Sequence, residues 1–575
     1  MASDLREFYD CLNREEAELA AEISTDSLGL VMRIAINELD LDFEAAHRGD
    51  DPGDGDHERS YLMRMGVVRI VKLAMQAHPR FEAPTLTFQR DLAYSAPVLS
   101  LIKQVGTIEH GRRVAQSLAA NVGRIERHHD RFRIVLAPRL IDLELHEREL
   151  DHYHVRRQRE AFEQGYRALV DVQVGDEVRS LLTELVYPFH THFIGYEADP
   201  TLDLYFFGLA YNETLISKGF DTFHFSTKFG NLTFQHYQLA AVFIVSVGMK
   251  HRAYVRALLE KEHTIRIEDV LTVSVTTESF TEGLREFINQ TGENLEGHVP
   301  VTDEDVRTIF DAISVSRRNL ALLDRPGAPI PPLVRCSDDH VIRPLVGATA
   351  EGVMLFLLNS LQHSFPTDYD RAQRAREGVM QRAVEKALRS VLPELEYRGN
   401  IKLRRGRNVL TDIDLVAAEQ QTGRVVLIQL KHQDPYGEDL ATRQTRTGRL
   451  NQQVGDWLDK VRSWLTAAST SELLATFRLP SSVSEPKISL LVLTRHYAHS
   501  LRPVVTGDDA AFSNWTQLVT AVARLREQKG HSAAIDDLIK ELRTLSVPEE
   551  EDYLPEPPSD WSVGALRFTI EQERD

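Results

Sequence analysis

Residues 411–433 read TDIDLVAAEQQTGRVVLIQLKHQ and predict two β-strands joined by a turn at residues 421–423. Side chains alternate between the two faces of a strand, so Asp412 and Asp414 share one face of the first strand. The second strand is almost continuously apolar over residues 425–430, which is typical of a strand inside a sheet covered on both faces. The stretch therefore predicts a buried hairpin at the centre of an α/β sheet.

Polar residues at one edge of this hairpin indicate a site for a divalent cation. Gln429 and Lys431 share a face of the second strand. A carboxylate from Asp414 and an amide oxygen from Gln429 suit Mg²⁺, which prefers oxygen ligands and takes one or two protein carboxylates; we expect Mn²⁺ to substitute. The Lys431 ammonium would orient an attacking water and stabilise charge on a phosphate, and burying it without a function would be costly. These residues indicate metal-dependent phosphodiester hydrolysis.

The alternative is an ordinary structural hairpin. In that interpretation Asp412 and Asp414 cap a turn, and Lys431 extends its ammonium outward to water.

The segments around the hairpin predict a complete α/β unit. Residues 371–391 have apolar positions at helical spacing, and Pro393 ends this helix. A strand over residues 395–405 follows, and beyond the hairpin come a helix over residues 443–465 and a buried strand over residues 487–493. The predicted order is helix, three strands, helix, strand.

This segment resembles the PD-(D/E)XK nuclease superfamily and, within it, the Mrr-like restriction endonuclease branch, in which Gln stands where most members carry Glu. Gln429-Leu430-Lys431 would be the (D/E)xK motif, and its 15-residue distance from Asp414 suits a hairpin of that core. The resemblance covers roughly residues 370–500. It implies an α/β (α+β overall) chain: an α-rich N-terminal region, then a restriction-endonuclease-like αβββαβ core with a central mixed sheet.

The resemblance also implies roles for single residues. Glu377 on the first helix would complete the metal site, but another alignment places Gln381 there, one turn later on the same face, and both positions stay open. The implied catalytic residues are Asp414, Gln429, Lys431 and Glu377, of which all but Lys431 would hold the metal. Four further residues are expected to lie next to these catalytic residues without binding the metal themselves: Gln381, Asp412, Gln452 and Gln453.

The charge distribution favours local contact with phosphates. The chain has a formal net charge of −19, which argues against nucleic-acid binding over its whole surface. Residues 398–450, however, hold ten Lys and Arg against six Asp and Glu, and a basic stretch beside a metal site suits a phosphate backbone. A solvated loop is the plainer interpretation of its KLRRGRN segment. The residues expected to contact nucleic acid are Lys402, Arg404, Arg405, Arg407, Arg443, Arg446 and Arg449.

Composition predicts a cytoplasmic protein without membrane contact. Cys11 and Cys336 are too few and too far apart for a disulfide framework. Residues 1–19 are acidic and amphipathic, unlike a signal peptide. The longest apolar run, residues 239–249, falls short of the ~20 residues of a bilayer span.

We expect five regions along the chain. They are a mostly helical region at 1–170, a mixed α/β region of unknown role at 171–323, a Pro-rich connector and helix at 324–369, the nuclease-like domain at 370–500, and C-terminal helices with an acidic tail at 501–575. Within the last, residues 561–570 are expected to return as a strand or to dock on the body.

The functional expectation is a DNA endonuclease of restriction or antiviral defence type that acts on double-stranded DNA. Cutting both strands favours a homodimer, and residues 1–370 could receive an activating partner. Two alternatives stay open: a catalytically inactive nuclease fold that binds nucleic acid or acts as a scaffold, and a DNA repair or mobile-element nuclease. The sequence does not separate DNA from RNA.

Overall fold

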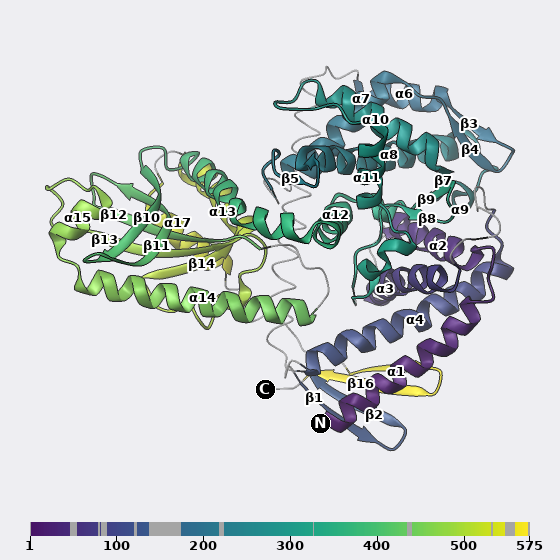
Figure 1. Cartoon of the computed structure of the whole chain (residues 1–575), viewed down its shortest axis with the longest axis horizontal. Coiled ribbons are helices and arrows are strands. Elements are labelled where there is room, and N and C mark those ends of the chain that lie inside the picture. Colours follow the sequence, from purple (N-terminus) through teal and green to yellow (C-terminus); the bar gives the residue numbers. More distant parts are fainter. Residues whose placement is uncertain are drawn as a thin grey trace.

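The computed structural model describes residues 2–46, 54–78, 81, 89–119, 123–136, 174–217, 223–325, 327–433, 440–530, 533–546 and 558–572. Figure 1 shows two lobes, a helix-rich lobe built by the N-terminal two-thirds and a lobe built around a five-stranded mixed sheet. Among the described helices, none is both long enough and apolar enough to span a membrane.

The N-terminal part of the helical lobe packs four helices against a small sheet. Its helices are α1 (Ala2–Ile23), α2 (Leu30–Ala46), α3 (Asp54–Ala77) and α4 (Leu92–Ala119). Its strands are β1 (Gly123–His128), β2 (Arg131–Leu136), β15 (Ser559–Val563) and β16 (Leu566–Gln572). The C-terminal strand β16 pairs parallel with β2, so the segment at 561–570 returns as part of a β-hairpin beside the N-terminal helices.

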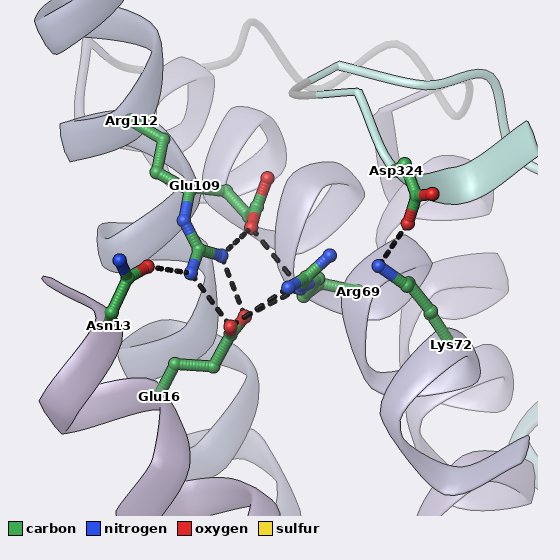
Figure 2. A network of polar contacts seen from close by, with 7 residues as sticks. All are labelled: Asn13, Glu16, Arg69, Lys72, Glu109, Arg112 and Asp324. Carbon is green, nitrogen blue, oxygen red and sulfur yellow. Dashed lines mark hydrogen bonds and ion pairs between the residues drawn. The ribbon is translucent and has the colours of Figure 1, made fainter. Parts of the chain in front are cut away.

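A largely buried charged network joins three of these helices (Figure 2). Glu16 on α1 accepts hydrogen bonds from Arg69 on α3 at 2.5 and 2.8 Å and from Arg112 on α4 at 2.6 and 2.7 Å. Arg112 also donates to Glu109 at 2.6 Å. Each charge is paired, which is the condition for burying charged groups between helices.

The middle of the chain completes the helical lobe. It begins with α6 (Val174–Leu185), β3 (Val186–Phe189), β4 (Phe193–Tyr196), α7 (Pro200–Tyr211), the π-helix η1 (Asn212–Ser217), β5 (Lys228–Phe229), β6 (Leu232–Thr233) and α8 (Phe234–Lys261). It continues with α9 (Ile267–Val270), β7 (Val273–Thr276), α10 (Thr277–Gly292), α11 (Asp303–Ile313), the 3₁₀-helix η2 (Arg317–Leu323), β8 (Val334–Arg335), β9 (His340–Arg343), the 3₁₀-helix η3 (Val346–Ala348) and α12 (Ala350–Ser364). Helix α8 is buried along most of its length and packs against α7, α10 and α12.

The second lobe contains the predicted succession of helix, three strands, helix and strand, with an additional short helix before the fourth strand and further elements after it. Its elements are α13 (Pro366–Arg389), β10 (Glu396–Arg405), β11 (Asn408–Glu419), β12 (Arg424–Lys431), α14 (Leu440–Ala467), α15 (Thr470–Phe477), β13 (Lys487–Thr494), the 3₁₀-helix η4 (His499–Leu501), β14 (Ala510–Asn514), α16 (Trp515–Lys529) and α17 (Ile535–Ser546). The strand order is β10-β11-β12-β13-β14; β11 runs antiparallel to both of its neighbours, β10 and β12, and β13 and β14 continue parallel to β12.

The predicted central hairpin is confirmed. Strands β11 and β12 pair antiparallel, and β12 is the third of the five strands, with six buried residues in a row. Gly423 closes the turn with φ +72° and donates its N–H to the carbonyl of Glu419 at 2.9 Å. Helices α13, α16 and α17 cover one face of the sheet, and α14 and α15 cover the other.

Helix α13 belongs to both lobes. Tyr369 and Ala372, near its start, are buried in the core around α8, whereas Met380 and Val384 are buried against the five-stranded sheet. The helix begins at Pro366, earlier than predicted, because proline is well suited to the first turn of a helix. In Figure 1 this helix leads from one lobe into the other, and α14 reaches back to contact α4.

Candidate metal and nucleic-acid site

The hairpin register brings two of the predicted ligands level with each other. Leu415 lies opposite Ile428 in the antiparallel pairing of β11 and β12. Continued by one residue, this register places Asp414 opposite Gln429, and residues opposite each other in a sheet share a face. Their side chains are 8 % and 6 % exposed, so two oxygen-bearing groups are buried at the same end of the central strands.

The carboxylate of Asp414 holds the two strands together where their regular pairing ends. Its Oδ2 accepts a hydrogen bond from the backbone N–H of Leu430 at 2.7 Å. This contact fixes the orientation of the carboxylate relative to the strand that carries Gln429.

An irregular backbone marks the same level of the neighbouring strand. The pairing of β10 with β11 places Asn400 opposite Asp414, and Asn400 has φ +57°, in the left-handed region that asparagine tolerates better than most residues. Ile413 and Leu415, on either side of Asp414, are buried in the cores on opposite faces of the sheet. The regular alternation of β11 therefore changes at Asp414.

Gln429 carries a buried acceptor with no donor among the described residues. Its Oε1 is inaccessible to water and accepts no hydrogen bond from any group that the structure describes. Burying such an oxygen without a partner costs about 1–3 kcal/mol. These oxygen atoms suit a hard cation, because Mg²⁺ binds an amide oxygen together with a carboxylate.

Lys431 lies at the end of the same strand, two residues beyond Gln429 and therefore on the same face. Its side chain is half-buried, and no acidic group in the described ranges forms an ion pair with it. The strand end is well anchored: Arg495 donates its backbone N–H to the Lys431 carbonyl at 3.0 Å, and Gln433 Oε1 accepts from the backbone N–H of Tyr497 at 2.9 Å.

Helix α13 reaches the site through Gln381. The side-chain amide of Gln381 lies against Gly399 of β10 so closely that it fills the space a Cβ at Gly399 would need, and the backbone carbonyl of Asp414 borders the same space. Glu377 lies one turn earlier on the helix, but its side chain is outside the described part. Gln381 therefore lies beside the backbone of Asp414.

Two tryptophans align α14 along the hairpin on the other face. Trp464 Nε1 donates to the carbonyl of Arg404 and Trp457 Nε1 to the carbonyl of Asp412, both at 3.0 Å. Arg404 on β10 lies opposite Val409 on β11. The two tryptophan contacts are therefore at the levels of Val409 and Asp412, three residues or about 10 Å apart along β11. Seven helical residues span about 10.5 Å, so α14 runs along β11 in the opposite direction.

A second step of this length, from Trp457 toward the start of α14, reaches Leu450 and the adjacent Asn451 near the level of Asp414 and Leu415. Asn451 Oδ1 is buried and has no hydrogen-bond donor in the described part of the chain. The neighbouring Gln452 and Gln453, which the resemblance placed near the site, are exposed. Asn451 was missed by sequence reasoning, although its helical spacing from the buried Val454 and Leu458 places it on the inner side of α14.

The predicted basic residues occupy the outer end of the β10–β11 hairpin and the first half of α14. Lys402, opposite Asp412 in register, is exposed, and Arg446 is half-buried. The side chain of Arg443 lies outside the described residues. Exposed residues for which the described chain offers no acidic ion-pair partner are Lys402, Arg404, Arg405, Arg407 and Arg449.

The ligand set differs from a cage of several carboxylates. Within the described ranges, no three or more His, Cys, Asp or Glu side chains gather in a way that could hold a metal ion. The described oxygen-bearing groups in this region are the Asp414 carboxylate and the Gln429 amide on the hairpin, together with the buried amide oxygen of Asn451 on α14.

Comparisons with protein families, with curated proteins and with solved structures find no match for this chain.

Proposed function

We propose that the chain is a metal-dependent nuclease with a restriction-endonuclease-like αβββαβ core of the PD-(D/E)XK type, Mrr-like branch, at residues 370–500. One observation carries the proposal: the buried carboxylate of Asp414 lies opposite Gln429, whose buried side-chain oxygen accepts no hydrogen bond from any described residue. The element order around them and the five-stranded mixed sheet support the same assignment. The activity proposed is endonucleolytic cleavage of double-stranded DNA, in restriction or antiviral defence.

Asp414 and Gln429 would hold Mg²⁺ or Mn²⁺, with Glu377 as a further ligand from α13. When bound, the cation supplies a polarised water and neutralises charge on the phosphate. Asn451, whose buried amide oxygen lies on the inner side of α14, would supply an additional neutral oxygen. Gln381 would position the strand that carries Asp414 by filling the space beside Gly399.

Lys431 would place its ammonium next to the attacking water and the phosphate, where a positive charge stabilises the negative charge that develops during hydrolysis. Its lack of a described ionic partner supports this role. The exposed basic residues of the β10–β11 hairpin would contact phosphates on either side of the cleaved bond. A homodimer would supply two such sites, one for each strand of the duplex, and residues 1–370 would receive an activating partner.

A second candidate function is a non-catalytic nucleic-acid-binding or scaffold protein on the same core. The presence of a single described carboxylate at the site favours this non-catalytic function, because a site with fewer negative charges binds a divalent cation more weakly. A repair or mobile-element nuclease would use the same chemistry on other DNA substrates.

Calorimetric titration of the full chain with Mn²⁺ tests the metal site. We expect binding that Asp414→Asn weakens by at least about tenfold, because a charged ligand becomes neutral at nearly the same size. Asp459→Asn, which neutralises an exposed carboxylate on α14, serves as the matched control and should bind like the wild type. Wild-type affinity in Asp414→Asn would place the metal elsewhere.

A further inference from the structure

A cavity in the helical lobe is formed by residues that take no part in the proposed nuclease site. It opens between the end of α7, the start of α8 and the turn after α10, and its volume is about 230 Å³. This is room for about eight water molecules, and it is smaller than the usual site for a drug-sized ligand. The cavity therefore suits a small, compact ligand.

Gln235 at the start of α8 places a side-chain amide at the wall of this cavity. Gln235 is 8 % exposed, and its backbone N–H donates to the carbonyl of Phe225 at 3.0 Å, which ties the start of α8 to the segment before it. The carboxamide of Gln235 lines the cavity and forms no hydrogen bond with any residue that the structure describes. This amide is therefore available for a hydrogen bond to a ligand that enters the cavity.

The remaining walls define the chemistry of the ligand. Tyr211 and Phe225 supply aromatic rings, and Leu239 at 1 % exposure supplies an apolar surface. Gln238 adds a second carboxamide, so the cavity offers two donor-and-acceptor groups beside aromatic walls. A flat heteroaromatic ring with polar edges matches this combination, because it can stack on the aromatic rings while both amides bond to its edge.

The described walls of the cavity offer no cation for a phosphate. No Lys, Arg or His is among the described residues that line the cavity, whereas Glu296 contributes a carboxylate. A phosphorylated ligand would lack a cation and would face a like charge. An uncharged ring, with or without a sugar, needs no cation and is not repelled by the Glu296 carboxylate.

We propose that this cavity binds a nucleobase or nucleoside, held by the amides of Gln235 and Gln238. The site does not depend on the proposed nuclease activity, since it shares no residue with the hairpin site.

Calorimetric titration of the full chain with adenosine, guanosine, cytidine and uridine tests this site. We expect at least one nucleoside to bind with a dissociation constant below about 1 mM, and its 5′-monophosphate to bind about tenfold more weakly. Gln235→Leu and the half-buried Gln238→Leu should each weaken nucleoside binding by about tenfold or more, whereas Gln528→Leu, an exposed glutamine on α16, should not.

Three results would overturn the proposal: no nucleoside binds below about 1 mM, both leucine variants of the cavity bind like the wild type, or the monophosphate binds as tightly as the nucleoside.

Discussion

Among single residues, Gln429 bears a cost that folding alone does not explain. The other residues of β12 from Val425 to Leu430 are buried apolar side chains, and a leucine at Gln429 would continue that pattern. Gln429 instead lies opposite Asp414, and its buried side-chain oxygen has no hydrogen-bond donor among the described residues. Groups kept at the expense of stability are common at functional sites.

Substitution of Gln429 should separate stability from metal binding. Gln429→Leu should raise the free energy of unfolding by about 1–3 kcal/mol, because it removes an unsatisfied buried acceptor, and it should weaken Mn²⁺ binding. Gln429→Glu should tighten Mn²⁺ binding by about tenfold, since it adds a second carboxylate. Urea unfolding and calorimetry measure the two effects. Unchanged Mn²⁺ affinity in Gln429→Leu would remove this residue from the metal site.

Local patterns predicted the residues of the hairpin well. Asp414, Gln429 and Lys431 could be placed together because strand alternation and a short turn are set by adjacent residues. Asn451 could not, since its approach to the hairpin follows from the packing of α14. The contact of Gln381 with Gly399 could not be predicted either, because it depends on the position of α13 against β10.

At the level of elements, α1, α3 and α4 depend on the charged network in Figure 2. Burial acts to raise the pKa of Glu16, but hydrogen bonds from Arg112 and Arg69 outweigh it and lower that pKa to about 2. Lys72 on α3 pairs with Asp324 beside the network. The helices are therefore joined by a carboxylate that must stay ionised.

Glu16→Gln should lower the free energy of unfolding by about 3 kcal/mol at neutral pH, because it leaves Arg69 and Arg112 buried with fewer partners. The folded pKa of Glu16 is depressed, so its contribution is present above the unfolded value of 4.5 and is lost as the pH falls through about 2. Urea unfolding at pH 7 and pH 3 measures the contribution. Glu18→Gln, on the exposed side of α1, is the control, and an equal effect of both substitutions would contradict the account.

At the level of the whole molecule, contacts between distant segments join the parts of the chain. Strand β16 pairs with β2 at positions such as Ile570 opposite Ile134, and no local pattern indicates such a partner. The sequence could therefore predict a returning strand but not the sheet that receives it. The helix-rich N-terminal region and the mixed central sheet were predicted because helical and strand periodicities are local.

Asp40 provides another long-range connection. Its carboxylate on α2 accepts hydrogen bonds from Thr272 at 2.7 Å and from the backbone N–H groups of Leu345 and Val346 at 2.9 Å. Burial nevertheless raises the pKa of Asp40 to about 6. The N-terminal helices are thus tied to the middle region through a carboxyl group that titrates in an accessible range.

The raised pKa of Asp40 predicts a pH dependence with a definite sign. Its contribution to stability is fullest below the unfolded value of 3.8 and is lost as the pH rises through about 6, because the folded state then holds a buried charge. Asp40→Asn removes this titration, so the stability of the variant relative to the wild type should rise by about 2–3 kcal/mol between pH 4 and pH 7. Urea unfolding across this range measures the difference. A constant difference between the two proteins would contradict the prediction.

The central claim is that the hairpin site hydrolyses DNA with the help of Lys431. The most direct measurement is plasmid cleavage by the purified full chain with Mg²⁺, Mn²⁺ or EDTA, run beside Lys431→Ala and Lys487→Ala. Lys487 is a matched control because it lies exposed on β13, at the opposite end of the strand pair that Lys431 ends. The account predicts metal-dependent cleavage by the wild type and Lys487→Ala, and none by Lys431→Ala. Cleavage by Lys431→Ala at the wild-type rate would contradict it.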